Sequence, residues 1–320
     1  MPLPERTLLS RIRRTTRYKP GNIAGIGDDC AILRIPPGHD ALVTTDFSLE
    51  GIHFRRDWHP PDAIGHRCLT RGLSDVAAMG GIPLAVFLSL ALPETLPQKW
   101  VDEFMRGLLR LAKQHDVSLA GGDTAQSPSG VIADIIVLGS APRGKAIRRS
   151  GARPGDKIYV TGTLGGSAAA LQMLRAGEKL RPRNFLRHFY PEPRIALGKY
   201  LREHSLASAM IDSSDGLSTD LAHICEESGV GAEIDAKLIP RATIGKSSRR
   251  VDMNFALHGG EDYELIFTAP PKKKVPAKIA GVPVTEIGHI MKGKKIILIG
   301  ARRERKKLNS LGWEHFSIKN

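Results

Sequence analysis

Several features that would assign this chain to a special class are missing from its sequence. Its 320 residues include only three cysteines, Cys30, Cys68 and Cys225, which lie far apart, so neither a disulfide framework nor a zinc site is indicated. No apolar run is long enough to span a membrane. Residues 1–20 are basic and amphipathic and lack the apolar block of a signal peptide. We therefore expect a cytoplasmic protein with no membrane partner.

The familiar catalytic signatures are missing as well. There is no Gly-x-Ser-x-Gly elbow, kinase catalytic loop or His-Glu-x-x-His motif. The glycine-rich segment 161–167 lacks the Gly-Lys-Ser/Thr ending of a P-loop, so it predicts close packing. The eleven histidines are scattered, and the sequence shows no Ser–His or Cys–His nucleophile pair. These absences fit a reaction whose acceptor is already an anionic phosphate and needs no general base.

Positive charge is abundant but uneven. The formal net charge is +14, and residues 241–320 hold 17 Lys or Arg against 7 Asp or Glu. No aromatic residues interleave the basic runs 272–274 and 302–307, as they do in single-strand binders. We interpret these runs as a solvated face and predict no nucleic-acid partner. Attraction of anionic substrates is an open alternative.

Against this basic background, carboxylates cluster beside Gly, Ser or Thr at six places. These are residues 27–29, 44–46, 74–75, 121–123, 212–216 and 259–262. One such motif is an ordinary turn former, but six of them next to predicted strand or helix ends indicate a site. Short oxygen ligands on small-residue loops are what Mg²⁺ prefers, commonly together with substrate phosphates. The sequence therefore predicts a metal-dependent phosphoryl-transfer site built from both halves of the chain.

The length and the alternation of patterns predict two domains of the α/β or α+β class. A connector rich in Gly, Pro and Arg spans 142–156, so we place the domains at 1–141 and 142–320. In the first domain we expect strands at 41–45, 84–92, 117–120 and 131–138 and helices at 5–14, 61–79 and 97–115. In the second we expect strands at 158–161, 209–211 and 263–268 and helices at 165–175 and 217–228.

Taken in order and spacing, the acidic motifs resemble one known family. Three further motifs belong to the same set: Glu50-Gly51-Ile52-His53-Phe54, Arg149-Ser150-Gly151-Ala152 and Gly312-Trp313-Glu314-His315-Phe316. Together they resemble the thiamine-monophosphate kinases, a branch of the superfamily of aminoimidazole ribonucleotide synthetase, over nearly the whole chain. The resemblance implies ATP-dependent phosphorylation of thiamine phosphate to thiamine diphosphate with several Mg²⁺ ions. The alternative is another ATP-dependent synthetase of the same superfamily.

The resemblance also implies a quaternary structure. The protein would be a homodimer in which the mixed N-terminal sheets of two subunits combine into a barrel. The N-terminal domain would bind ATP and Mg²⁺ and form the dimer, and the C-terminal α/β domain would complete the active site.

Site residues follow from the same resemblance, motif by motif. The metal ligands would be Asp28, Asp29, Thr44, Thr45, Asp46, Asp75, Asp123, Asp212 and Asp215. ATP would contact Met105, Gly122, Asp123, Arg149 and Ser214. Thiamine phosphate would contact His53, Glu261 and Trp313.

Two of these assignments carry a physical argument of their own. Trp313 suits a cationic thiazolium, because an indole face attracts cations; the alternative is that it anchors the chain end in the core. Met105 stands where family members usually carry a tyrosine, so we expect weaker stacking on adenine.

Overall fold

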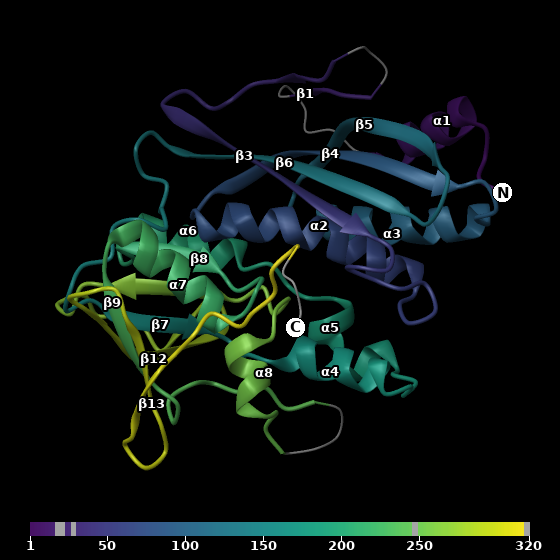
Figure 1. The fold of residues 1–320 in the computed structure, drawn as a ribbon. Coiled ribbons are helices and arrows are strands. Elements are labelled where there is room, and N and C mark those ends of the chain that lie inside the picture. Colours follow the sequence, from purple (N-terminus) through teal and green to yellow (C-terminus); the bar gives the residue numbers. More distant parts are fainter. Residues whose placement is uncertain (17–22, 27–29, 245–248, 317–320) are drawn as a thin grey trace. The chain divides into compact units, whose positions relative to one another are not determined.

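The computed structural model describes residues 1–16, 23–26, 30–244 and 249–316. The chain divides into two compact units. The N-terminal unit comprises Met1–Val76 and Gly81–Lys145, and the C-terminal unit comprises Ala77–Gly80 and Ala146–Asn320 (Figure 1).

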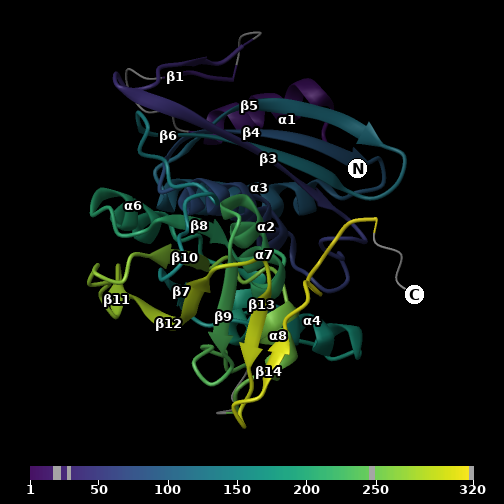
Figure 2. The same ribbon diagram turned by 60° about the vertical axis from the view of Figure 1, so that its left-hand side comes forward.

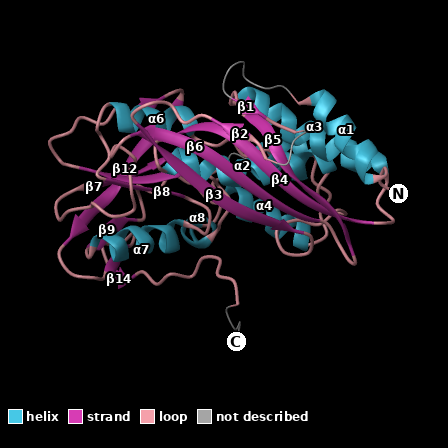
Figure 3. Ribbon diagram, turned by 90° about the horizontal axis from the view of Figure 1, so that it is seen from above, coloured by secondary structure: helices cyan, strands magenta, loops and turns pink. Residues whose placement is uncertain are grey.

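The N-terminal unit is built on a four-stranded sheet with the order β3-β6-β4-β5 (Figure 3). Its strands are β3 (His39–Leu49), β4 (Ile82–Pro93), β5 (Ser118–Ser127) and β6 (Ile132–Pro142). The β4–β5 pair is parallel, and the other two pairs are antiparallel. A short hairpin of β1 (Ile23–Ala24) and β2 (Ile32–Leu33) precedes this sheet.

Two long helices, α2 (Pro61–Ala78) and α3 (Gln98–Gln114), cover one face of this sheet, and α1 (Glu5–Thr15) lies near β5 (Figure 1). Side chains alternate along the strands, so Leu88 and Ile135 are buried beneath the helices. A Cβ atom at Gly72 of α2 would lie 2.6 Å from Val137, so the helix lies directly on β6. The opposite face, which we call the open face, is exposed.

The C-terminal unit is built on an eight-stranded sheet with the order β14-β13-β9-β12-β7-β10-β8 and β11 beside β12 (Figure 2). The strands are β7 (Lys157–Thr161), β8 (Ala209–Asp212), β9 (Gly231–Asp235), β10 (Leu265–Ala269), β11 (Lys278–Ile279), β12 (Val282–Met291), β13 (Ile296–Ile299) and β14 (Arg305–Lys307). Pairing is antiparallel except between β13 and β9.

Helices pack on both faces of this larger sheet. They are α4 (Gly166–Arg175), the 3-10 turn η1 (Pro182–Asn184), α5 (Leu186–Phe189), α6 (Ile195–Glu203), α7 (Leu217–Ser228) and α8 (Met253–His258). Alternation along the central strand β7 divides the core: Ile158 and Val160 pack in the cluster that contains α7 residues. Tyr159 faces the other way, into the cluster of α6, and stacks on Phe267 with ring centroids 5.1 Å apart.

The structure confirms a two-domain mixed α/β fold with a smaller N-terminal sheet. Two predicted strand ends are wrong, since β3 continues through Asp46 to Leu49 and β5 continues through 121–123 to Ser127. Each strand is extended because a neighbouring strand continues to offer backbone partners. In the described residues no helix is both long and apolar enough to cross a membrane.

Candidate active site

A compact polar group lies between the N-terminal sheet and its helices. Asp46 and Thr44 extend from β3 towards α2, where the Thr44 hydroxyl donates a hydrogen bond to Asp75 Oδ2. Arg71 Nε of α2 lies 3.6 Å from Asp46 Oδ1. Burial raises the pKa of Asp46 to about 6, and Arg71 lowers it while the nearby Asp75 raises it further. We call Thr44, Asp46, Arg71 and Asp75 the helix-side cluster.

Two further predicted metal ligands of this unit, Thr45 and Asp123, lie on the open face. Thr45 follows Thr44 in the strand and points the other way, and its hydroxyl donates to Asp134 Oδ1 at 2.7 Å. Asp134 of β6 and Asp123 of β5 are both register partners of Ser89 on β4, so these carboxylates share the open face. The period of two therefore divides the predicted ligands between two faces of one sheet.

His53 lies in a turn that follows β3 and is held by side-chain hydrogen bonds. The backbone N–H of Leu49 donates to His53 Nδ1 at 3.0 Å, which leaves the ring proton of the neutral form on Nε2. Glu50 closes the turn, because its carboxylate accepts from Arg56 Nε at 2.6 Å and from the Val131 N–H at 2.8 Å. The structure thus fixes the orientation of the His53 ring.

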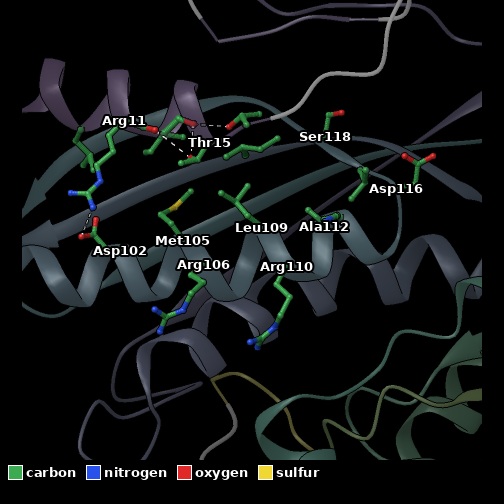
Figure 4. A pocket seen from close by; sticks show the side chains of 16 residues that line it. Arg11, Thr15, Asp102, Met105, Arg106, Leu109, Arg110, Ala112, Asp116 and Ser118 are labelled. Carbon is green, nitrogen blue, oxygen red and sulfur yellow. Dashed lines mark hydrogen bonds and ion pairs between the residues drawn. The ribbon is translucent and has the colours of Figure 1, made fainter.

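Met105 lines a cavity of about 960 Å³ in the N-terminal unit. The cavity lies between α1 and α3, and Met105 and Leu109 point from α3 towards α1 (Figure 4). Leu119 on β5 also lines the cavity, and Asp123 lies four residues further along the same strand, about 13 Å away at the usual rise. The register of β5 on β4 shifts between Leu119 and Gly121, so Leu119 faces the helices whereas the Asp123 side chain lies on the open face.

Three motifs that are distant in the sequence meet at the start of α7 in the C-terminal unit. Ser214 and Asp215 lie in the loop between β8 and α7. The Ser214 carbonyl accepts a hydrogen bond from the Glu261 N–H at 2.8 Å, and the Asp215 carbonyl accepts one from the Trp313 N–H at 3.1 Å. The C-terminal unit thus brings together the predicted metal, nucleotide and substrate residues of its three motifs.

Close backbone approaches hold these three segments together. A Cβ atom at Gly260 would lie 2.3 Å from the Ser214 carbonyl oxygen, and one at Gly312 would lie 2.1 Å from that of Asp215. Glu261 has a φ of +62°, a strained conformation of the kind that clusters at functional sites. The Trp313 side chain is 38% exposed, so it is not a deeply buried anchor of the chain end.

Carboxylates also gather around the first turn of α7. Burial raises the pKa of Asp220 well above its usual range, and the charges of Asp212 and Asp215 raise it further. The Gly216 N–H donates to Asp220 Oδ2 at 2.9 Å and opposes this shift. In the part of the chain that the structure describes, no group of three or more His, Cys, Asp or Glu side chains is arranged to hold a metal ion. Each unit instead offers carboxylates that repel one another.

The structure does not bring all the predicted residues together. The Arg149 carbonyl accepts from the Ser228 hydroxyl at 3.1 Å, at the end of α7, whereas Ser214 precedes the start of that helix. Asp28 and Asp29 lie outside the described residues.

Sequence reasoning missed several residues around these sites. Arg71, Asp134 and Asp220 occupy ordinary positions in amphipathic segments, so their type and spacing carry no signal. Two Ser–His hydrogen bonds were also not foreseen: Ser167 Oγ lies 3.0 Å from His188 Nδ1, and Ser218 Oγ lies 2.8 Å from His258 Nδ1. Folding unites residues that are 21 and 40 positions apart.

Both serines are nevertheless inaccessible. Ser167, His188 and Ser218 are each 1% exposed. Their hydrogen bonds satisfy buried hydroxyl groups, and neither serine is placed to attack a substrate.

Comparisons with known proteins show the family to which the chain is similar. Residues 27–141 match the model of the AIR synthase related protein, N-terminal domain, and residues 153–301 match the corresponding C-terminal domain. The chain is 42% identical over 279 residues to thiamine-monophosphate kinase of Salmonella typhimurium, covering 83% of each chain. It is 40% identical over 306 residues to that of Escherichia coli K12, covering 92% of each.

Solved structures of thiamine-monophosphate kinases are also similar to this chain. The crystal structure of thiamine-monophosphate kinase from Stenotrophomonas maltophilia matches with a TM-score of 0.81 and 36% identity, over 93% of this chain and 97% of that one. AaThiL complexed with AMPPCP and TMP matches with a TM-score of 0.78 and 31% identity, over 98% and 97%. The hydrogenase maturation protein HypE, at 18% identity and a TM-score of 0.77 over 96% and 98%, shares the fold.

Proposed function

The chain belongs to the thiamine-monophosphate kinase family, and we propose that it transfers the γ-phosphoryl group of ATP to thiamine phosphate, giving thiamine diphosphate. A relative whose sequence is 31% identical to this one was solved with AMPPCP and TMP. The observation that carries the proposal is the meeting of Ser214, Asp215, Glu261 and Trp313 at the start of α7. It joins residues of three separate motifs in one described site.

Direct in-line transfer is the mechanism that these residues favour. The acceptor phosphate oxygen is anionic at neutral pH, so no general base has to remove a proton from it. The two Ser–His pairs are buried, so they do not provide a phosphoenzyme route. What the protein must supply is alignment of two phosphates and compensation of their negative charge.

The residues fit Mg²⁺, because the donors are carboxylate and hydroxyl oxygens. Thr44, Thr45, Asp46, Asp75 and Asp123 of the N-terminal unit and Asp212 and Asp215 of the C-terminal unit would hold several such ions. Asp28 or Asp29 would add a further ligand. Bound Mg²⁺ would neutralise phosphate charge and orient the transferred group. The partial burial of Asp46 next to Asp75 supports this role, since a cation relieves the repulsion between two half-buried carboxylates.

Substrate contacts complete the proposal. The base of ATP would occupy the cavity beside Met105, with Gly122, Asp123, Arg149 and Ser214 contacting the nucleotide. The thiamine ring system would lie on Trp313, with His53 and Glu261 as further contacts. Support comes from the exposed indole of Trp313 and from the fixed orientation of the His53 ring.

The open face of the N-terminal sheet supports a homodimer. Its apolar side chains Val43 and Phe47 are 69% and 57% exposed, and Ile132 of β6 is 37% exposed. Large apolar side chains that are exposed on one face of a sheet favour an interface there. We propose that two such sheets form a barrel across the dimer, with residues 1–141 as the nucleotide, metal and dimerisation domain and 142–320 completing the site. Light scattering tests this proposal by comparing the oligomeric state of Phe47→Asp with that of the unchanged protein.

A cytoplasmic location is also part of the proposal.

The decisive experiment measures ATP turnover with Mg²⁺ and thiamine phosphate, with thiamine, and with no acceptor. We expect thiamine diphosphate and ADP in equal amounts with thiamine phosphate only. If neither thiamine phosphate nor thiamine supports ATP turnover, another synthetase activity of the superfamily would be favoured. A protein band that keeps label from γ-labelled ATP after denaturation would contradict direct transfer.

A further inference from the structure

A fixed positive charge lies inside the group of carboxylates that we assign to Mg²⁺. Arg71 and Asp75 are one turn apart on α2, so both side chains extend from the same face of the helix. Arg71 Nε lies 3.6 Å from Asp46 Oδ1 of β3, and the two side chains are 18% and 26% exposed. This ion pair is only partly exposed to water, so its charges are screened less than those of the fully exposed pairs.

The residues next to Arg71 fix this part of α2 against the sheet. The next residue, Gly72, brings α2 directly against Val137 of β6. One turn earlier, Cys68 is completely buried, and burial raises the pKa of its thiol to about 12, so it adds no charge. Within the helix-side cluster as defined above, the charged groups beside Arg71 are the carboxylates of Asp46 and Asp75.

Charge balance in this cluster has a consequence for metal binding. With both carboxylates ionised, Asp46, Asp75 and Arg71 sum to a net charge of −1, and without the arginine the sum would be −2. A guanidinium does not lose its proton in proteins. At separations of a few ångströms one unit charge changes the attraction for a divalent cation strongly.

We propose that Arg71 is a built-in counter-ion of the Mg²⁺ site, which stabilises the helix-side cluster when no metal is bound and weakens the binding of Mg²⁺ to it. The inference rests on the proposed function, because it takes Asp46 and Asp75 as metal ligands. Arg71 is then a positioning residue that sets how much Mg²⁺ the enzyme needs.

The test is a Mg²⁺ titration of the full-length protein without nucleotide, at constant ionic strength. Binding of Mg²⁺ is measured by the melting temperature and by calorimetry. The proteins compared are the unchanged protein, R71Q, R71K and R143Q. In EDTA, R71Q should have a lower melting temperature than the unchanged protein. With Mg²⁺ its melting temperature should rise by more, and half-saturation should need a Mg²⁺ concentration lower by on the order of tenfold. R71K keeps the charge and should stay close to the unchanged protein. R143Q removes an exposed arginine in the turn after β6 and is the control for general charge.

Each outcome decides the question. Unchanged or weaker Mg²⁺ binding by R71Q would overturn the counter-ion role, as would an equal gain in affinity in R143Q. If R71Q does not fold, R71M replaces it; failure of both to fold with saturating Mg²⁺ would make Arg71 an indispensable structural residue and also overturn the proposal. If the unchanged protein itself shows no response to Mg²⁺, it is the metal assignment of the proposed function that fails.

Discussion

The two units of this protein hold their candidate site residues in opposite ways. In the N-terminal unit they project from regular elements, such as Asp46 from the middle of β3 and Asp75 from α2. In the C-terminal unit they lie on loops, such as Ser214 and Glu261, which are tied by backbone hydrogen bonds and close glycine contacts.

The difference matches two chemical tasks. Metal ligands must keep a fixed geometry, which strands and helices provide, because regular backbone hydrogen bonds restrain these elements. Loops that approach each other through backbone atoms can shape a surface around an organic substrate. We therefore expect substitutions of Asp46 and Asp75 to affect catalysis, and substitutions of the loop residue Trp313 to affect recognition of the organic substrate.

The largest expected effect tests the N-terminal unit. Asp75→Asn should lower turnover by about a thousandfold or more, since loss of a metal ligand removes several kcal/mol of charge stabilisation. The melting temperature in EDTA should stay equal or rise, because an amide still accepts from Thr44 and no longer repels Asp46. Near-normal turnover at low Mg²⁺ would remove Asp75 from the metal site, and far-UV circular dichroism checks that the fold is intact.

The second prediction concerns stability of the C-terminal loops. Burial raises the pKa of Asp262 to about 7, although its carboxylate accepts from the Gly165 and Ser167 N–H groups. Because the pKa of Asp262 in the folded protein lies above the ordinary aspartate value of 3.8, folding favours the protonated acid, and this stability is lost as pH rises from about 4 to 7. The contribution is on the order of a few kcal/mol.

Urea unfolding from pH 4 to pH 8 measures this effect. Asp262→Asn cannot titrate and should show a flatter decline of the unfolding free energy over that range than the unchanged protein. Equal slopes for the two proteins would mean that Asp262 is ionised throughout.

The third prediction separates recognition from catalysis. Trp313→Ala should raise the Michaelis constant for thiamine phosphate, at a cost of about 1–2 kcal/mol of binding, and leave the constant for ATP unchanged. A lower melting temperature with both constants raised together would instead identify Trp313 as an anchor of the chain end. Kinetics with both substrates, combined with thermal melts, distinguish the two outcomes.

The smallest expected effect lies in the cavity of the N-terminal unit. Met105→Tyr should strengthen ATP binding, or the preference for ATP over GTP, by about 1 kcal/mol, if the new ring stacks on the base. Leu109→Met is a matched control, because it changes a neighbouring lining residue without adding a ring. An unchanged affinity and preference in Met105→Tyr would place the base outside this cavity.

The sequence by itself determined much of this protein. Its periodicity predicted α2, α3, α4 and α7 to within a few residues, because each buries one face at helical spacing. Its motifs predicted the family and the phosphoryl-transfer chemistry, because short acidic motifs are local in the sequence and can be identified without knowing the tertiary contacts. The two strand ends were misjudged because glycine and aspartate signal turns locally, whereas a neighbouring strand can keep them in a sheet.

Only the tertiary structure decided which of these groups act together. Pairing of β3 with β6 sends Thr44 and Thr45 to opposite faces, and packing of α2 on the sheet brings Arg71 to Asp46. Residues almost a hundred positions apart, Asp215 and Trp313, are joined by a backbone hydrogen bond. Such contacts depend on long-range packing of elements, which no local pattern of residues encodes, and this is why the counter-ion Arg71 is recognisable only in the folded chain.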